Sequence, residues 1–388
     1  MEGRLRTRRG GALLNGLDQQ HKEARYGIDS YLDWVEREKL LVHTGLAIDC
    51  FTVETRDWPR AGVPSAVLHL DGRGDFCNAF VFNIPPGAST VPQRHLYEEI
   101  VYVLEGNGST QIELPNGEKR SFEWGPTALF AIPLNATYRH FNGSGLARAL
   151  ITTTTNAPMM LNLFHNERFI FDNAFFFDER VGKEEYYAGE GVLNMVRQGN
   201  NTWETNFIAN LSTIELPDFS DRGAGGGNLI FLLADSSMHA HVSEMPAGTY
   251  KKAHRHVAGY NVMCVAGSGF SLMWFEGDQE YVRIDWHHGV LFPPAHQQFH
   301  QHFTTSSVPA RYLAMGFGSL RYPFTQERRN EILGKDVKFS TSIKKGGDQI
   351  EYEDQDPRIH PIWIAEMKKH GLTPHMDKYF PERVAAKL

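Results

Sequence analysis

The chain of 388 residues has few cysteines, no long apolar run and no excess of positive charge. Its three cysteines, Cys50, Cys77 and Cys264, are widely spaced and form no CxxC pair, which argues against a disulfide framework or a thiolate zinc site. The apolar runs 128–134 and 229–234 fall far short of the ~20 residues that cross a bilayer. With a formal net charge of −7, a dedicated nucleic-acid binder is not expected either. We therefore expect a cytoplasmic protein with neither a membrane nor a nucleic-acid partner.

The first eleven residues contain four arginines but no apolar segment, so they do not resemble a secretory signal. We interpret them as a solvated arm, with a targeting peptide as the alternative. The length of the chain predicts two or three domains, each large enough to bury a core.

Short strands dominate the predicted secondary structure. A helix is expected over 28–39, capped by Ser30 with Asp33 three residues on. An amphipathic helix is expected over 361–371. Between them, short segments rich in β-branched and aromatic residues alternate with Gly, Pro and Asn, which is typical of an all-β sandwich or barrel.

Two β regions repeat the same landmarks. Gly87, His95 and Gly106 are spaced eight and then eleven residues apart, and the second region has a glycine, His256 and Gly267 at the same two spacings. In each region a His-Phe pair follows about 34 residues after the last of these glycines. A repeat of this size indicates a duplicated domain rather than a solenoid.

The second β region carries a group of histidines. His254 and His256 form an H-x-H pair, and the period of two in a strand would place both imidazoles on one face, opposite Arg255. Downstream, His300 and His302 repeat this spacing. If His300 meets the pair from across a curved barrel, three neutral imidazoles converge. Such a set suits Fe, Ni, Cu or Zn rather than Mg or Ca.

At these positions the sequence resembles the cupin superfamily, and its duplication resembles a two-barrel bicupin. The family pattern G-x5-H-x-H-x3/4-E-x6-G is matched by Gly248, the H-x-H pair and Gly267, with Tyr260 in the place of the glutamate. His300 takes the place of the family's last histidine ligand. The resemblance covers about 45–325 and implies an all-β fold of two tandem cupin (double-stranded β-helix, jelly-roll) barrels, with short helical arms at both ends. It also implies that these three histidines hold a metal.

The first region matches this pattern incompletely. His95 and Glu99 fit, whereas Gln93 and Tyr138 stand where the first and last histidines would be. A Gln amide is a poor ligand, and a phenol with a pKa near ~10 is mostly protonated. We expect a degenerate metal site in which His95 and Glu99 form a buried hydrogen-bonded pair. His140 could add a third ligand.

Three imidazoles without a carboxylate leave a divalent ion its full charge and three open positions, which favours an anionic or chelating substrate. Cupins with a similar three-histidine arrangement include ring-cleaving, diketone-cleaving and thiol dioxygenases. The resemblance therefore implies an Fe(II) oxygenase acting on a small chelating carbonyl or hydroxy-aromatic molecule, with Mn, Ni, Cu and Zn as alternative metals. Tyr260 could donate its phenol proton to an oxygen ligand. His302 could orient a ligand through a hydrogen bond.

Two other functions remain open at this point. One is a different metal-dependent cupin enzyme, such as an isomerase, hydrolase or decarboxylase. The other is a bicupin that binds a small molecule without catalysis. We also expect a homo-oligomer.

The predicted organisation has five parts. An N-terminal arm and helix (1–44) precede an N-terminal barrel with the degenerate site (45–165). A linker (166–210) leads to a C-terminal barrel with the metal site (211–325). A C-terminal arm (326–388) completes the chain.

Overall fold

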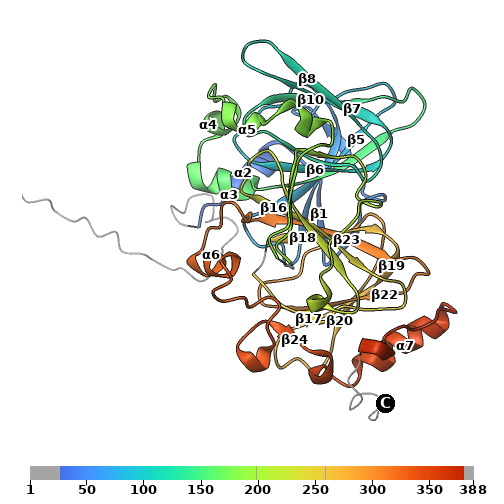
Figure 1. Cartoon of the computed structure of the whole chain (residues 1–388). Coiled ribbons are helices and arrows are strands. Elements are labelled where there is room, and N and C mark those ends of the chain that lie inside the picture. Colours follow the sequence, from blue (N-terminus) through green and yellow to red (C-terminus); the bar gives the residue numbers. More distant parts are fainter. Residues whose placement is uncertain (1–26, 198, 258, 380–388) are drawn as a thin grey trace, which may run out of the picture.

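The computed structural model describes residues 27–379 apart from 198 and 258, so the predicted N-terminal arm lies outside the described residues. The described chain forms two stacked β-barrels, with helices at the periphery (Figure 1). The predicted all-β fold of two tandem barrels is confirmed.

The first barrel is built from two sheets. The larger sheet has the order β1-β4-β5-β11-β6-β9-β14 with β3 beside β4, and the smaller has the order β10-β7-β8. In β10 alternate residues are buried, as expected for a strand with one covered face, whereas β11 is buried throughout. The strands are β1 (Val42–Gly45), β3 (Arg56–Trp58), β4 (Val63–Leu70), β5 (Asn78–Ile84), β6 (Glu99–Glu105), β7 (Gly108–Glu113), β8 (Lys119–Trp124), β9 (Leu129–Ile132), β10 (Thr137–Asn142), β11 (Ala149–Thr155) and β14 (Phe207–Ile208).

The second barrel repeats this plan. Its larger sheet has the order β12-β13-β15-β16-β23-β18-β21-β2, and its smaller sheet has the order β20-β19-β22-β17-β24. The strands are β2 (Ile48–Asp49), β12 (Val192–Asn194), β13 (Thr202–Glu204), β15 (Gly227–Leu232), β16 (Met238–Met245), β17 (Ala253–His254), β18 (Tyr260–Ala266), β19 (Ser268–Trp274), β20 (Val282–His287), β21 (Val290–Phe292), β22 (Phe299–Thr304), β23 (Ala310–Phe317) and β24 (Gln349–Ile350).

Short strands from distant parts of the chain complete each barrel. β2 lies in the early part of the chain but pairs with β21 of the second barrel, and β14 pairs with β9 of the first barrel. β24 lies far beyond the second barrel in sequence and pairs with β17. The predicted boundaries at 45, 166, 211 and 326 remain a proposal, because strand pairing joins segments on both sides of them.

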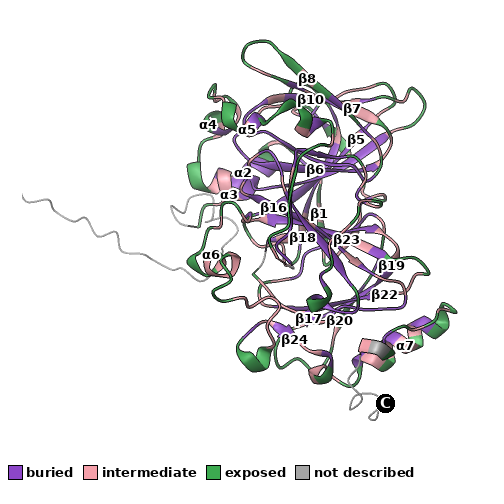
Figure 2. Cartoon of the chain, viewed as in Figure 1, coloured by how far each residue is buried: buried purple, intermediate pink, exposed green. Residues whose placement is uncertain are grey.

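The two larger sheets pack against each other. One buried cluster combines residues of the first barrel, such as Leu68 and Val81, with residues of the second, such as Val242 and Leu313. Figure 2 shows buried residues along the strands where the barrels meet. A strand that faces its own barrel on one side and the other barrel on the opposite side is covered on both, which explains the continuous burial of β11. The barrels therefore share an apolar core.

The helices differ in detail from the predictions. Asp29 caps the first helix by accepting two backbone amide protons, so the expected box of Ser30 and Asp33 is wrong: Ser30 already lies in the first turn. The last helix packs Trp363 and Met367 against the second barrel. The helices are α2 (Ser30–Arg37), α3 (Ala157–Phe164), α4 (Glu167–Phe171), α5 (Asp178–Val181), α6 (Gln326–Ile332) and α7 (Ile359–Lys369), with 3-10 turns η1 (Glu184–Tyr187), η2 (Ser220–Arg222), η3 (Ile343–Lys345), η4 (Tyr352–Asp354) and η5 (Asp377–Tyr379).

No helix in the described part of the chain combines the length and the apolar character needed to span a membrane.

Candidate metal centre

Three histidines converge in the second barrel. His254 lies in β17 directly opposite His300 in the neighbouring strand β22, and their ring centroids are 4.1 Å apart. His256 follows the end of β17, with its ring centroid 4.8 Å from that of His300. One ring nitrogen from each residue lies within 4.8 Å of the other two. The chain therefore brings together the three residues that the sequence predicted as ligands, although His300 approaches from the adjacent strand and not from across the barrel.

Backbone carbonyls orient two of the three rings. The Nδ1 atom of His256 lies 2.7 Å from the carbonyl of Val257, and that of His300 lies 3.0 Å from the carbonyl of Gln298. A carbonyl only accepts, so each Nδ1 must carry the proton, and each Nε2 keeps a lone pair for an ion. The Nδ1 atom of His254 is buried and has no hydrogen-bond partner in the described part of the chain. The ring orientations fit metal binding.

Electrostatics keep the three rings neutral. Burial is the largest cause, and with the charges of Arg222 and Arg328 it lowers the pKa of His256 to about 4, although the hydrogen bond to the carbonyl of Val257 acts in the opposite direction. Burial, followed by the nearby cationic or histidine side chains, also holds the pKa values of His254 and His300 well below the ordinary value. A ligating imidazole must be neutral, so the site is prepared for a cation near neutral pH.

The donor set decides which ion fits. Three imidazoles without a carboxylate match a first-row transition metal, whereas Mg and Ca prefer oxygen ligands. Arg255, between the two histidines of the pair, points away and pairs with Glu276 and Asp348 at 2.8 and 3.1 Å. It therefore does not add its charge to the ion-binding face.

Tyr260 lies beside the three histidines. Its ring centroid is 5.0 Å from that of His256 and 5.4 Å from that of His239. Burial raises the pKa of the Tyr260 phenol, so the hydroxyl keeps its proton. This position is compatible with the predicted role as a proton donor, which stays a prediction.

Sequence reasoning missed a second H-x-H pair, His239 and His241 on β16. The Nε2 atom of His239 lies 2.7 Å from Nδ1 of His241, and Nδ1 of His239 has no hydrogen-bond partner among the described residues. Lys251 is also buried in this barrel, and its Nζ atom has no hydrogen-bond partner among the described residues. Burial lowers the pKa of this amine to about 7. The spacing of the two histidines was visible in the sequence, whereas the burial of Lys251 depends on the folded barrel.

His302 forms a hydrogen-bonded chain that the first barrel repeats. Its Nδ1 atom lies 2.7 Å from the hydroxyl of Ser271, which accepts from the indole of Trp286 at 2.9 Å. In the first barrel the indole of Trp124 donates to the hydroxyl of Thr110 at 2.9 Å, and this hydroxyl lies 2.8 Å from Nδ1 of His140. A chain present in both barrels favours a structural role for His302, and its predicted role in orienting a ligand stays a prediction.

Close backbone approaches are repeated as well. A Cβ on Gly108 would lie 2.1 Å from the carbonyl oxygen of Phe141, and a Cβ on Gly269 would lie 2.0 Å from that of Phe303. Both glycines also face the indole of the tryptophan in their own barrel. Two barrels with the same strand plan, the same hydrogen-bonded chain and the same close approaches are two copies of one domain.

This architecture of two repeated barrels is the one that the resemblance of the sequence to bicupins implies.

Comparison with known proteins finds only distant structural likenesses. No protein-family model and no curated protein matches the sequence. Oxalate decarboxylase from Bacillus subtilis is a similar solved structure, with 12% identity and a TM-score of 0.46 over 71% of this chain and 77% of that one. Vicilin from Capsicum annuum has 16% identity and a TM-score of 0.46 over 70% of this chain and 85% of its own.

In the first barrel a tyrosine hydroxyl lies between the residues that match the metal pattern. The hydroxyl of Tyr138 donates to Glu99 at 2.6 Å and lies 3.0 Å from Nε2 of His95. The other ring nitrogen of His95 faces the carbonyl of Tyr97 at 2.8 Å. Hydrogen bonds to His95 and Tyr138 lower the pKa of Glu99, although burial alone would raise it. These groups satisfy one another, and the degenerate metal site stays a prediction.

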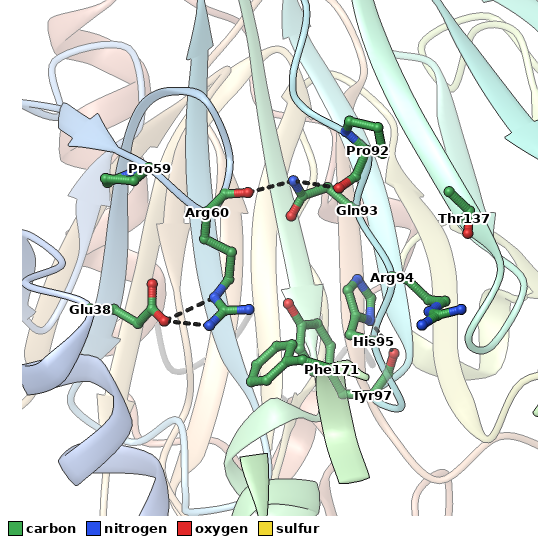
Figure 3. A pocket seen from close by; sticks show the side chains of 10 residues that line it. All are labelled: Glu38, Pro59, Arg60, Pro92, Gln93, Arg94, His95, Tyr97, Thr137 and Phe171. Carbon is green, nitrogen blue, oxygen red and sulfur yellow. Dashed lines mark hydrogen bonds and ion pairs between the residues drawn. The ribbon is translucent and has the colours of Figure 1, made fainter. Parts of the chain in front are cut away.

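A cavity of about 620 Å³ opens beside His95 (Figure 3). It lies in the first barrel, whereas the histidine triad lies in the second. Arg60, Gln93 and Tyr97 are among its lining residues. The volume is sufficient for a small organic molecule.

Proposed function

We propose that the second barrel is a mononuclear metal centre and that the protein is a metal-dependent oxygenase. The observation that carries the proposal is the approach of ring nitrogens of His254, His256 and His300 to within 4.8 Å of one another, without a carboxylate in the set. The expected metal is Fe(II), with Mn, Ni, Cu and Zn as alternatives. The expected substrate is a small chelating carbonyl or hydroxy-aromatic molecule.

The charge of the site supports a chelating, anionic substrate. A bound divalent ion would supply Lewis acidity and, as Fe(II), the capacity for dioxygen chemistry. The three neutral ligands leave its charge uncompensated. Arg222 and Arg328 lie within electrostatic range of His256 and have the same sign as the ion. A substrate that brings a negative oxygen would relieve this excess positive charge.

Tyr260 is the proposed proton donor. Its phenol remains protonated because burial raises its pKa, and its ring contacts His256. A protonated phenol beside the metal ligands can hydrogen-bond to a substrate oxygen and hold a proton there. Tyr260→Phe removes only this hydroxyl, so we expect metal to be retained while turnover falls by about 10²-fold or more.

Anaerobic purification with elemental analysis, followed by an O2-uptake screen, tests the proposal. The screen would use catechols, gentisate-like acids and β-diketones, with His256→Ala as the variant that lacks a metal ligand. We expect about one transition-metal ion per chain and substrate-dependent O2 consumption that is absent in the variant. Metal without O2 consumption would point to an isomerase, hydrolase or decarboxylase instead. A protein without metal would point to a binding function.

A further inference from the structure

We propose that the first barrel contains a second, metal-free binding site, which takes a small organic carboxylate in the 620 Å³ cavity beside His95 (Figure 3). This site is separate from the metal centre of the second barrel and does not depend on the oxygenase activity. Two side chains with unused hydrogen-bond donors converge on it from different segments of the chain.

The first donor is Arg60, whose guanidinium is held in place on two sides. Its Nε and Nη2 atoms donate to Oε1 of Glu38 at 2.9 and 2.5 Å, and its Cζ atom lies 4.1 Å from the ring centroid of Phe171. Glu38 is itself fixed by the indole of Trp58 at 2.8 Å. The Nη1 atom of Arg60 has no hydrogen bond to any described residue. An oriented guanidinium with a free N–H is a preorganised anchor for a carboxylate.

The second donor is the hydroxyl of Tyr97. The ring of Tyr97 stacks on that of His95 with centroids 3.6 Å apart, and burial raises the pKa of its phenol well above the ordinary value, so the hydroxyl keeps its proton. Within the described chain no acceptor pairs with this hydroxyl, and Figure 3 shows it directed toward Arg60. A carboxylate between the two groups would receive one hydrogen bond from each.

The remaining lining residues narrow the class of ligand. Gln93 uses its Nε2 atom on the carbonyls of Arg60 and Val91 at 2.6 and 3.0 Å, so its Oε1 atom is left to accept from a ligand hydroxyl or amine. Pro59 and Pro92 add apolar surface. The lining contains two arginines, one of them Arg60, and a single carboxylate, so its net positive charge favours an anionic ligand. The ligand is a carboxylate with a small apolar or aromatic body.

A metal ion is not part of this site. The hydroxyl of Tyr138 hydrogen-bonds to both residues that match the metal pattern, to His95 at 3.0 Å and to Glu99 at 2.6 Å. The ligand is therefore recognised by side-chain donors alone.

Calorimetric titration of the full chain with benzoate, and with benzamide as the uncharged analogue of the same shape, tests the proposal. We expect benzoate to bind, benzamide to bind at least about tenfold more weakly, and His254→Ala, which removes a proposed metal ligand, to leave the benzoate affinity unchanged. Arg60→Met should weaken benzoate binding by about tenfold. Arg148→Met is the matched control, because Arg148 pairs with Glu105 in the same barrel away from the cavity.

Tyr97→Phe provides a second variant that keeps the ring and its stacking on His95. It should weaken benzoate binding about threefold or more with an unchanged thermal midpoint, which keeps the test valid if Arg60→Met does not fold. Absence of benzoate binding to the wild type would overturn the proposal. Binding that is lost in His254→Ala and kept in both Arg60→Met and Tyr97→Phe would also overturn it, since the benzoate would then sit at the metal centre.

Discussion

His254 and His300 face each other across two neighbouring antiparallel strands, with ring centroids 4.1 Å apart. Because directly opposed residues in such a pair lie only ~5 Å apart, strand pairing alone brings two imidazoles together. The third, His256, reaches the same place from the segment that follows β17. Two of the three proposed ligands are therefore positioned by backbone hydrogen bonding rather than by a flexible loop.

The first prediction separates His300 from His302. We expect His300→Ala to lose most of its bound metal, because it removes a nitrogen of the converging set. His302→Ala should retain metal, because the Nδ1 atom of His302 is committed to Ser271. Elemental analysis after purification measures both, and His95→Ala in the first barrel is the matched control. Equal metal loss in the His300 and His302 variants, with both folded, would contradict the assignment.

A second prediction concerns the structural role of His302. His302→Phe leaves the hydroxyl of Ser271 without its ring partner, so we expect the free energy of unfolding to fall by about 1–3 kcal/mol. His140→Phe should cause a similar loss, because His140 makes the equivalent bond to Thr110. Denaturant unfolding measures both. A stable His302 variant with greatly reduced turnover would instead support the catalytic role.

Acid should destabilise the metal-free protein. Burial lowers the pKa of His241 and His302 to about 3 and that of His140 to about 4, whereas histidines in the unfolded chain titrate near ~6.5. Below about pH 6.5 the unfolded state therefore binds more protons than the folded state, and the free energy of unfolding must fall as the pH is lowered toward 4. We expect the thermal midpoint to drop steadily over this window. A midpoint that stays constant or rises between pH 6.5 and 4.5 would contradict the burial of these rings.

Gly269 has no room for a side chain. A Cβ at this position would lie 2.0 Å from the carbonyl oxygen of Phe303 and 2.5 Å from the indole of Trp286, so we expect Gly269→Ala to destabilise the protein by about 1–3 kcal/mol. Gly108→Ala should behave alike in the first barrel. The control is Gly145→Ala, where no atom lies within 4 Å of the added carbon. Thermal unfolding compares the three variants, and a Gly269 variant as stable as the Gly145 variant would argue against the close approach.

The barrels are also joined by a buried carboxylate. Glu98 accepts from the backbone amide of Ser237 at 2.9 Å and from its hydroxyl at 2.5 Å, and it pairs with Arg180. Glu98→Ala would leave the guanidinium and both donors of Ser237 without this acceptor, so we expect a loss of about 3 kcal/mol in unfolding free energy. Chemical denaturation measures it. Glu123→Ala, on an exposed position of β8, should have little effect.

The sequence by itself determined the duplication and the proposed ligand set. The glycines at Gly106 and Gly267 recur at the same spacing because each barrel needs the same close approach there: a Cβ would lie 2.8 Å from the Cα of Ala149 or of Ala310. The H-x-H pair and His300 stood out because they occupy the histidine positions of the pattern that the sequence resembles. Alternating short strands were enough to predict an all-β fold, since period-two burial is a local property.

Only the tertiary structure decided how distant segments meet. It placed β2 in the second barrel and β14 in the first, and it set His300 beside His254 in an adjacent strand. It also directed the hydroxyl of Tyr138 between His95 and Glu99 and gathered Arg60 and Tyr97 around one cavity. These relationships depend on strand pairing and packing between residues far apart in sequence, and no local pattern encodes which strand will be the partner of another.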